Sequence, residues 1–218
     1  MIGVLGGSGG VGASSFAAVL AVSACARFLI DLDVLGGGID VTLGIEDAPG
    51  ARWSGVQLSG GSLESEALAA GLPRAGPCAV LAADMPELDA AAVEQVLDVT
   101  AVSGPIVLDL PRHPCAERAA AFRYTCFLLV LARGDVGGLV AAHATVRGLP
   151  DVPRGLVVRR GPVAAESAAE LIGAPLIGQL PPLSASQAPV DPDRLPRALA
   201  RVAAGILAGL GVDTGALR

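Results

Sequence analysis

The sequence predicts an α/β protein in which a mostly parallel sheet lies between two layers of helices, a three-layer α/β/α sandwich. Short apolar runs of strand length recur along the chain, and they lack the polar alternation of strands that face water. Alanine-rich stretches of helical period separate these runs, which is the β-α-β order of a parallel sheet. A glycine-rich turn follows the first run directly, at the strand-to-helix junction where α/β proteins bind ligands.

The length of 218 residues suits one domain of this kind, and we expect a single domain over residues 1–218. The expected strands are Met1–Leu5, Phe28–Leu32, Cys78–Ala82, Ile106–Leu110, Phe127–Leu131, Gly155–Val158 and Leu176–Gly178. The expected helices are Ser14–Ala26, Leu63–Ala70, Ala90–Val102, Ala116–Tyr124, Val136–Arg147, Val163–Ile172 and Pro192–Leu210. Residues Gly36–Gly61, rich in Gly, Ser and Asp, form the longest stretch in which we expect irregular structure.

Composition excludes several classes of function. The chain is 52% hydrophobic and only 17% charged, against about 25% charged in an average domain, so it is expected to bury a large core. Its net charge of −6 argues against a general affinity for nucleic acid. All 15 basic residues are arginine, which excludes Schiff-base chemistry and a phosphate-binding lysine. The sequence has neither a signal-peptide pattern nor an apolar stretch of ~18 residues, so we expect a cytoplasmic protein.

The turn GGSGGVGASS, residues 6–15, fits two nucleotide-binding patterns. The first is the dinucleotide pattern G-x-G-x-x-G, formed by Gly7, Gly9 and Gly12 between a strand and a helix. Asp31 ends the second strand, where dinucleotide-binding proteins place an acid for the ribose hydroxyls. This pattern predicts an NAD-dependent oxidoreductase domain, although the sequence shows no evident catalytic partner for it.

The second pattern is a P-loop, in which backbone N–H groups of a glycine-rich turn bind phosphates at a helix start. Ser14 and Ser15 stand where a hydroxyl holds Mg²⁺, and Asp109 ends a later strand as a magnesium-side acid does. The second strand ends in two acids, Asp31 and Asp33, whereas the dinucleotide pattern needs one. A carboxylate at this edge of the sheet can orient a water molecule toward a terminal phosphate, which makes Asp33 the candidate catalytic residue.

These segments also carry a family resemblance. Residues 9–15, GGVGASS, resemble the deviant Walker A loop of the ParA/MinD ATPases, K-G-G-x-G-K-[ST]-[ST]. Residues 31–44 resemble their second strand and switch I, Asp109-Leu110-Pro111 resembles switch II, and Gly178-Gln179-Leu180-Pro181 resembles the loop that closes on adenine. The resemblance implies the P-loop NTPase fold of this family, with ATP or ADP and Mg²⁺ as ligands.

The resemblance also assigns the site residues by their positions. The nucleotide would be bound by Gly9, Gly10, Val11, Gly12, Ala13, Ser14, Ser15, Arg159 and Pro181, Mg²⁺ would be held by Ser14 and Asp109, and Asp33 would be catalytic. Three positions depart from the family, because Ser8 and Ala13 replace lysines and Arg159 replaces an asparagine. Loss of a phosphate-binding lysine removes a charge-assisted contact worth about 1.5–3 kcal/mol. We therefore expect nucleotide binding with weak or absent hydrolysis.

The segment DLDVLGGGIDVTLGIEDAPGARWSGV, residues 31–56, is most similar to the CpaE/TadZ branch of this family, including CpaE-like and septum-site-determining proteins of high-GC Gram-positive bacteria. The branch implies a localisation factor that positions pilus or secretion machinery or the division septum. It further implies a homodimer, protein partners from those machineries, and recruitment to a pole or septum. The alternatives are the NAD-dependent oxidoreductase and an interaction module that binds no nucleotide.

Four further features allow two interpretations each. Cys115 beside His113 suggests a Cys-His nucleophile pair, but a cysteine at a helix start is the simpler interpretation. Arg112 is a candidate substitute for a missing lysine, and a solvent-facing arginine is the simpler expectation. Trp53 is either a core anchor or a partner contact. The last helix has one apolar face, and we favour packing of this face on the sheet over direct contact with a membrane. The face is formed by Leu195, Leu199, Val202, Ile206 and Leu210.

Overall fold

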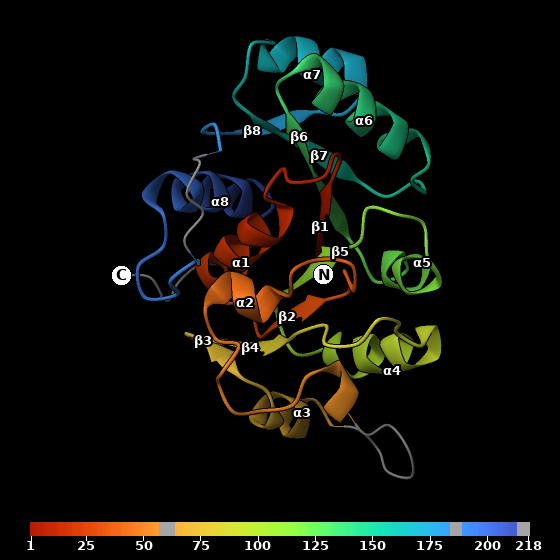
Figure 1. The fold of residues 1–218 in the computed structure, drawn as a ribbon, viewed down its shortest axis with the longest axis vertical. Coiled ribbons are helices and arrows are strands. Elements are labelled where there is room, and N and C mark those ends of the chain that lie inside the picture. The colour runs from red at the N-terminus through yellow and green to blue at the C-terminus, as the bar shows by residue number, and fades with distance from the viewer. Residues whose placement is uncertain (57–63, 184–188, 213–218) are drawn as a thin grey trace.

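The computed structural model describes residues 1–56, 64–183 and 189–212, and its strands form one sheet of eight (Figure 1). The strands are β1 (Ile2–Gly6), β2 (Phe28–Asp31), β3 (Arg74–Ala75), β4 (Cys78–Leu81), β5 (Ile106–Leu110), β6 (Phe127–Arg133), β7 (Arg154–Arg159) and β8 (Leu176–Leu180). Their order is β3-β4-β2-β5-β1-β6-β7-β8, and all neighbours are parallel except β3 and β4. The predicted α/β class with a mostly parallel sheet is confirmed.

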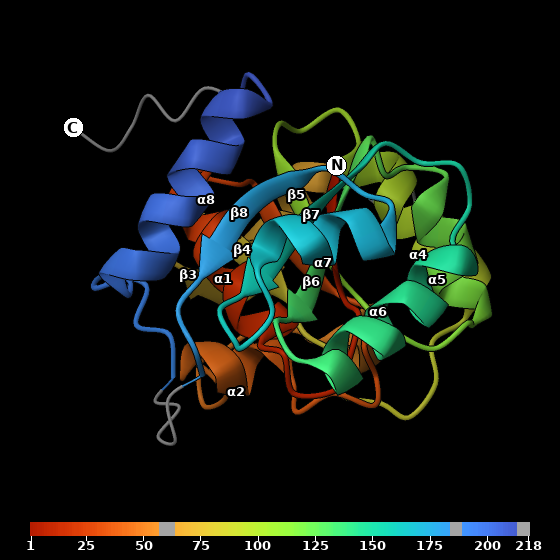
Figure 2. The ribbon, with the colours of Figure 1, turned by 90° about the horizontal axis from the view of Figure 1, so that it is seen from above.

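Helices cover both faces of the sheet (Figures 1 and 2). One face is covered by α1 (Ala13–Ser23), α2 (Ile39–Leu43) and α8 (Arg197–Gly209). The other is covered by α3 (Ser65–Gly71), α4 (Ala90–Thr100), α5 (Ala116–Phe122), α6 (Val136–Arg147) and α7 (Ala165–Ile172). Side chains alternate between the two cores along each strand, as Leu128 and Leu129 of β6 show. None of the helices in the described ranges combines the length and apolarity that a membrane crossing requires.

The central strand β1 determines where the functional site lies. It pairs with β5 on one side and β6 on the other, so that Ile2 is in register with Val107 and Phe127. Because these strands are parallel, the carboxyl ends of β1, β2 and β5 meet at one edge of the sheet. The glycine-rich turn, the end of β2 and Asp109 therefore converge, as the sequence predicts.

The strand order also bears on the dinucleotide interpretation. In that fold the second strand lies directly beside the first, so that its terminal acid reaches the ribose bound at the glycine turn. Here β5 lies between β1 and β2, and the residue paired with Asp31 is Asp109 of β5. This topology argues against the dinucleotide arrangement and in favour of the P-loop interpretation.

Several boundaries differ from the sequence prediction. The helix α2, the short strand β3 and a 3₁₀ turn at Trp53–Gly55 were not expected, because elements of two to five residues leave too weak a periodic signal. The last helix begins at Arg197 rather than Pro192, since Pro196 disfavours a helical conformation for the residue before it. The strand expected to end at Gly178 extends through Leu180, so Gln179 and Leu180, expected in a loop, belong to β8. The expected helix start at Leu63 lies outside the described residues.

The apolar face of α8 packs against the protein, as the favoured interpretation predicts. Ile206 is buried in the core shared with α1, and its predicted face partners are partly buried against the same core. Val202 of α8 packs closely on Gly178 of β8. A Cβ atom added to Gly178 would lie 2.8 Å from Cγ1 of Val202. The face that could have met a membrane is thus used within the fold.

Candidate functional site

The turn between β1 and α1 presents unpaired backbone donors. Gly12 immediately precedes α1 with φ of 82°, and Gly10 has φ of 65°, both left-handed values that favour glycine. No residue in the described ranges accepts a hydrogen bond from the backbone N–H groups of residues 9–15. Such a set of free N–H groups at the start of an eleven-residue helix favours a bound anion.

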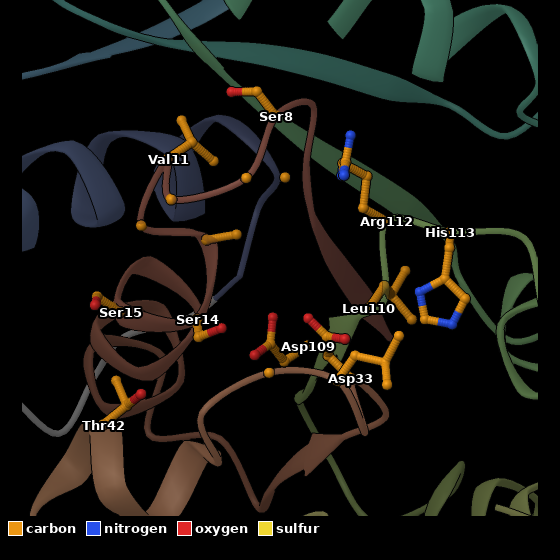
Figure 3. Close-up of a pocket in the computed structure, with 17 residues that line it drawn as sticks. Ser8, Val11, Ser14, Ser15, Asp33, Thr42, Asp109, Leu110, Arg112 and His113 are labelled. Atoms are coloured by element: carbon orange, nitrogen blue, oxygen red, sulfur yellow. The ribbon is translucent and has the colours of Figure 1, made fainter. Parts of the chain in front are cut away.

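A cavity of about 530 Å³ lies in front of this turn (Figure 3). The predicted site residues that line it are Gly9, Gly10, Val11, Gly12, Ala13, Ser14, Ser15, Asp33 and Asp109. Leu35, Gly36 and Thr42, which the sequence prediction did not include, line it as well. Thr42 stands one turn into α2, and the missing prediction of this helix is the reason that Thr42 was overlooked.

Three carboxyl groups converge at the cavity, and those of Asp33 and Asp109 line it. Burial, with a smaller contribution from the charge of Asp33, raises the pKa of Asp31 to about 7, although hydrogen bonds from backbone N–H groups lower it. Burial also raises the pKa of Asp109 well above its ordinary range, the charge of Asp31 adds to this effect, and the Ser14 hydroxyl opposes it. Figure 3 shows the Ser14 side chain facing the Asp109 carboxylate. A cation at this point would relieve the accumulated negative charge.

Asp33 lies nearer the mouth of the cavity than the other two acids. Burial raises its pKa, while His113 and Arg112 lower it. In Figure 3, His113 lies on the Asp33 side of the cavity, whereas the Arg112 side chain points away from Asp33. In the described lining, Arg112 is the only side chain with a permanent positive charge, and it is exposed.

Asp31 organises the chain instead of facing a ligand. Its carboxylate accepts hydrogen bonds from the N–H groups of Asp33 (2.9 Å), Ile39 (3.0 Å) and Ala83 (3.3 Å). It thereby ties the end of β2 to the start of α2 and to the segment after β4. Because these contacts occupy both carboxylate oxygens, Asp31 is a positioning residue for Asp33.

Arg159 and Pro181, predicted on the adenine side, do not belong to the described lining of the cavity. They meet each other behind the glycine turn, where Arg159 donates from Nε to the Val11 carbonyl (2.8 Å) and from Nη1 to the Pro181 carbonyl (2.9 Å). The side chain of Arg159 is buried, and burial lowers the pKa of its guanidinium. Arg159 thus holds the turn from its rear side.

Ser8 and Ala13, at the positions where the ParA/MinD pattern has lysines, carry no charge. Ala13 is the first residue of α1 and contributes only a methyl group to the cavity. Ser8 is buried, and its hydroxyl has no hydrogen-bond partner among the described residues. A phosphate bound here must therefore be neutralised by backbone N–H groups, by Arg112 or by a metal ion.

The segment after β2 is ordered by one arginine that the sequence prediction did not single out. Arg52 donates to Asp40 (3.1 Å) and to the backbone carbonyls of Ile45, Glu46, Ala48 and Gly50 at 2.9–3.2 Å. The Trp53 indole donates to the Asp31 carbonyl (2.7 Å) and is 5% exposed, which makes Trp53 a core anchor. A partly buried arginine within a loop satisfies several carbonyls at once, but such carbonyls have no sequence signal.

Cys115 does not have the properties of a nucleophile. Burial and the neighbouring Glu117 raise the pKa of its thiol to about 11, against an opposing effect of Arg118. A reactive cysteine needs the opposite shift, toward the thiolate. The Cys-His nucleophile interpretation is therefore not favoured.

Comparison with known sequences yields two relatives. No protein-family model matches the chain. The uncharacterized proteins Rv3660c and MT3760, from the H37Rv and CDC 1551 strains of Mycobacterium tuberculosis, are each 38% identical over 188 residues, which is 83% of this chain and 54% of theirs. The chain thus spans about half the length of these relatives.

Solved structures resemble the whole chain. A ParA family ATPase from Chlorobium tepidum superposes with a TM-score of 0.74 at 12% identity, over 98% of this chain and 92% of that one. The cell division ATPase MinD of Pyrococcus furiosus gives 0.73 at 18% identity, over 95% and 98%. The septum site-determining protein MinD of Pyrococcus horikoshii, complexed with Mg-ADP, gives 0.63 at 16% identity, over 96% and 98%. The chain has the P-loop NTPase fold of the ParA/MinD ATPases, as the sequence resemblance implies.

Proposed function

We propose that this chain binds ATP or ADP with Mg²⁺ at the glycine-rich turn and acts as a ParA/MinD-type positioning factor. The observation that carries the proposal is the row of free N–H groups from Gly9 to Ser15, which faces a cavity of about 530 Å³. Backbone N–H groups at a helix start bind phosphate without any charged side chain. The P. horikoshii MinD neighbour, which has the same fold, carries Mg-ADP.

The acids of the site fit Mg²⁺. This ion prefers oxygen ligands in an octahedral arrangement and keeps several waters, so the Ser14 hydroxyl and the Asp109 carboxylate are suitable partners. When bound, Mg²⁺ would neutralise phosphate charge that no lysine neutralises here. Ser14 would hold the ion directly, and Asp109 would orient one of its waters.

Asp33 would orient a water molecule toward the terminal phosphate, but turnover should be slow. The chain has no lysine to stabilise the charge that develops in phosphoryl transfer, and Arg112, the one arginine in the described lining of the cavity, is exposed. By analogy with arginine fingers, loss of such a cation costs ~10³-fold or more in rate. The site proposed here therefore binds nucleotide with weak or no hydrolysis.

The finer role rests on residues 31–56, whose sequence resembles the CpaE/TadZ branch. In the structure this segment forms one unit around Arg52 and Trp53, and its helix α2 borders the nucleotide cavity. A ligand in the cavity would contact both this unit and the turn at Asp109. We infer that nucleotide binding changes how this unit interacts with partner proteins of pilus, secretion or division machinery. We further propose that the protein is cytoplasmic, is recruited to a pole or septum, and can form a homodimer.

Calorimetry with ATP and Mg²⁺, and separately with NAD, tests the binding proposal. We expect saturable heat with ATP–Mg²⁺ and with ADP–Mg²⁺, no heat with NAD, and tighter ATP binding by Ala13→Lys because a cation returns beside the phosphates. Ala204→Lys, which adds the same charge at an exposed position of α8 outside the cavity lining, serves as the matched control. Tight binding of NAD would support the interpretation as an oxidoreductase domain. Absence of binding heat with every nucleotide would support the interpretation as an interaction module.

A further inference from the structure

A second group of polar side chains lies at the border of the nucleotide cavity, where the loop after β5 enters α5. His113, Cys115 and Glu117 each offer one ligand atom, and these three atoms lie within 4.8 Å of one another. No other set of three potential metal ligands of these types lies so close together in the part of the chain that the structure describes. The group is separate from Ser14 and Asp109, which hold Mg²⁺ in the proposed function.

We propose that His113, Cys115 and Glu117 form a Zn²⁺ site with a fourth position open to water. Imidazole, thiolate and carboxylate are the three ligand types that zinc accepts in proteins. The thiolate and the imidazole select against Mg²⁺ and Ca²⁺, which take oxygen ligands. Three protein ligands and one water make up the four-coordinate arrangement of an open zinc site. The site stands on its own ligands and does not depend on nucleotide binding.

The spacing of the ligand atoms suits zinc after small side-chain rotations. A tetrahedral ion at about 2.0–2.3 Å from its ligands places the ligand atoms about 3.3–3.8 Å apart. The upper limit of 4.8 Å in the structure exceeds this spacing by roughly 1–1.5 Å. Because the three residues lie within five positions of one another, changes in χ angles bring their ends together without movement of any helix or strand.

The backbone that bears the ligands is held in place. Arg118 donates from Nη1 to the carbonyls of Pro111 (3.4 Å) and Arg112 (2.5 Å), so the guanidinium closes the loop that carries His113. Pro111 and Pro114 restrict the backbone of the same loop. A loop fixed in this way loses little conformational entropy when its side chains bind an ion.

The thiol and the carboxyl group face each other at the start of α5. The Cys115 thiol precedes this helix and lies within hydrogen-bond reach of the Glu117 carboxylate and of the Arg118 backbone N–H. Glu117 is only 8% exposed, and a buried carboxylate is costly unless a cation compensates it. A divalent ion deprotonates a coordinating thiol outright, so the thiol that is a poor nucleophile when free remains a competent ligand.

An adjoining cavity gives an ion access to the site. It has a volume of about 300 Å³ and is lined by His113 and Glu117 together with Glu87, Leu88 and neighbouring residues. The exposed carboxylate of Glu87 attracts cations toward this opening. The cavity also has room for the water molecule that would complete the coordination.

A competition titration against a chromophoric zinc chelator tests the site. The full chain is first stripped with EDTA, and the titration is run without nucleotide and with excess Mg²⁺, so that Asp33 and Asp109 are not counted. We expect one equivalent of Zn²⁺ to bind, with an affinity at least ~100-fold weaker in Cys115→Ser and in His113→Ala. Two matched controls, Cys126→Ser and His143→Ala, should retain the wild-type affinity, because neither residue belongs to the cluster.

Cobalt substitution gives a readout that does not depend on the variants. The unmodified chain with one equivalent of Co²⁺ should show a thiolate-to-cobalt charge-transfer band and the visible spectrum of a tetrahedral site. Absence of the thiolate band, absence of stoichiometric Zn²⁺ binding, or wild-type affinity in Cys115→Ser would each overturn the proposal. ATP–Mg²⁺ binding by the zinc-free chain would be unaffected by any of these results, so the two proposals fail separately.

Discussion

The glycine-rich turn has two unlike sides, and the contrast between them explains how this site can work without lysine. On the cavity side, the turn faces Asp33 and Asp109, two acids whose pKa values are raised by burial. On the rear side, it is held by Arg159, a buried cation bonded to the Val11 and Pro181 carbonyls. The fixed positive charge of Arg159 therefore holds the turn in shape, while a phosphate bound as proposed would rely on backbone N–H groups and a metal ion.

The largest effect is expected where the two sides meet, at Gly12. A Cβ there would lie 2.8 Å from Nη2 of Arg159, and φ of 82° is unfavourable for any other residue. Gly12→Ala should cost about 3 kcal/mol in the free energy of unfolding, measured by urea denaturation. Gly9→Ala is the matched control, since its Cβ would have no neighbour within 4 Å and its φ is not left-handed. Equal stability of the two variants would contradict the packing of Arg159 against the turn.

Removal of Mg²⁺ should weaken ATP binding on the cavity side of the turn and leave the contacts of Arg159 on the rear side intact. Without the ion, the phosphates meet Asp33 and Asp109 with only the exposed Arg112 as a compensating side chain. We expect EDTA to weaken ATP binding by ~100-fold, which is about 2.7 kcal/mol, in calorimetry at constant ionic strength. An ATP affinity that EDTA leaves unchanged would show that the N–H groups and Arg112 suffice.

Arg159→Met should loosen the rear side while the acids stay in place. The substitution keeps the length of the side chain but leaves the carbonyls of Val11 and Pro181 without their donor. We expect a loss of about 2 kcal/mol in stability together with weaker ATP binding. Arg160→Met, the exposed neighbour, should change neither quantity. If Arg159→Met bound ATP as tightly as the parent, the rear contact would be irrelevant to the site.

The smallest effect concerns the charge of the acids in the absence of metal. The pKa of Asp31 is raised from its ordinary value of 3.8 to about 7, so its contribution to stability is complete below pH 4 and is lost as the pH rises through 7. Asp109 shifts in the same direction, and Asp109→Asn should therefore stabilise the EDTA-treated chain at pH 8 more than at pH 5. Thermal unfolding of both chains at the two pH values measures the difference. A stabilisation that is equal at both pH values would exclude charge as its cause.

The same contrast separates what sequence can predict from what it cannot. Strand ends and the residues that follow them have a local pattern, and for this reason the turn, Asp33 and Asp109 could all be placed at one edge of the sheet. Arg159 could not be placed, because its partners are backbone carbonyls as far as 148 residues away in the sequence. Carbonyl groups are the same in every residue, so no pattern of side chains indicates which of them an arginine will meet.

Residues 32–56, which follow β2, illustrate a second limit. Its composition indicated irregular structure, yet α2 forms there and contributes Thr42 to the cavity. Five residues are too few for a helical period to be recognised. The hydrogen bonds of Arg52 and Trp53 that hold this region are satisfied only in the folded chain. Prediction from sequence therefore reached the fold and the front of the site but not the contacts that stabilise them.

The central position of β1 has a consequence for how the chain is assembled during synthesis. The strand β1 is synthesised before both of its neighbouring strands, in which Val107 and Phe127 are the partners of Ile2. Pairing over such separations is slow, because the entropy cost of closing a long loop comes before any stabilising contact has formed. The strands β2 and β4 can pair early in synthesis. The strand β1 can pair with both of its neighbours only after β5 and β6 have been synthesised. The site at the glycine-rich turn is thus completed late, and until then the apolar strand β1 lacks the two strands that flank it in the fold.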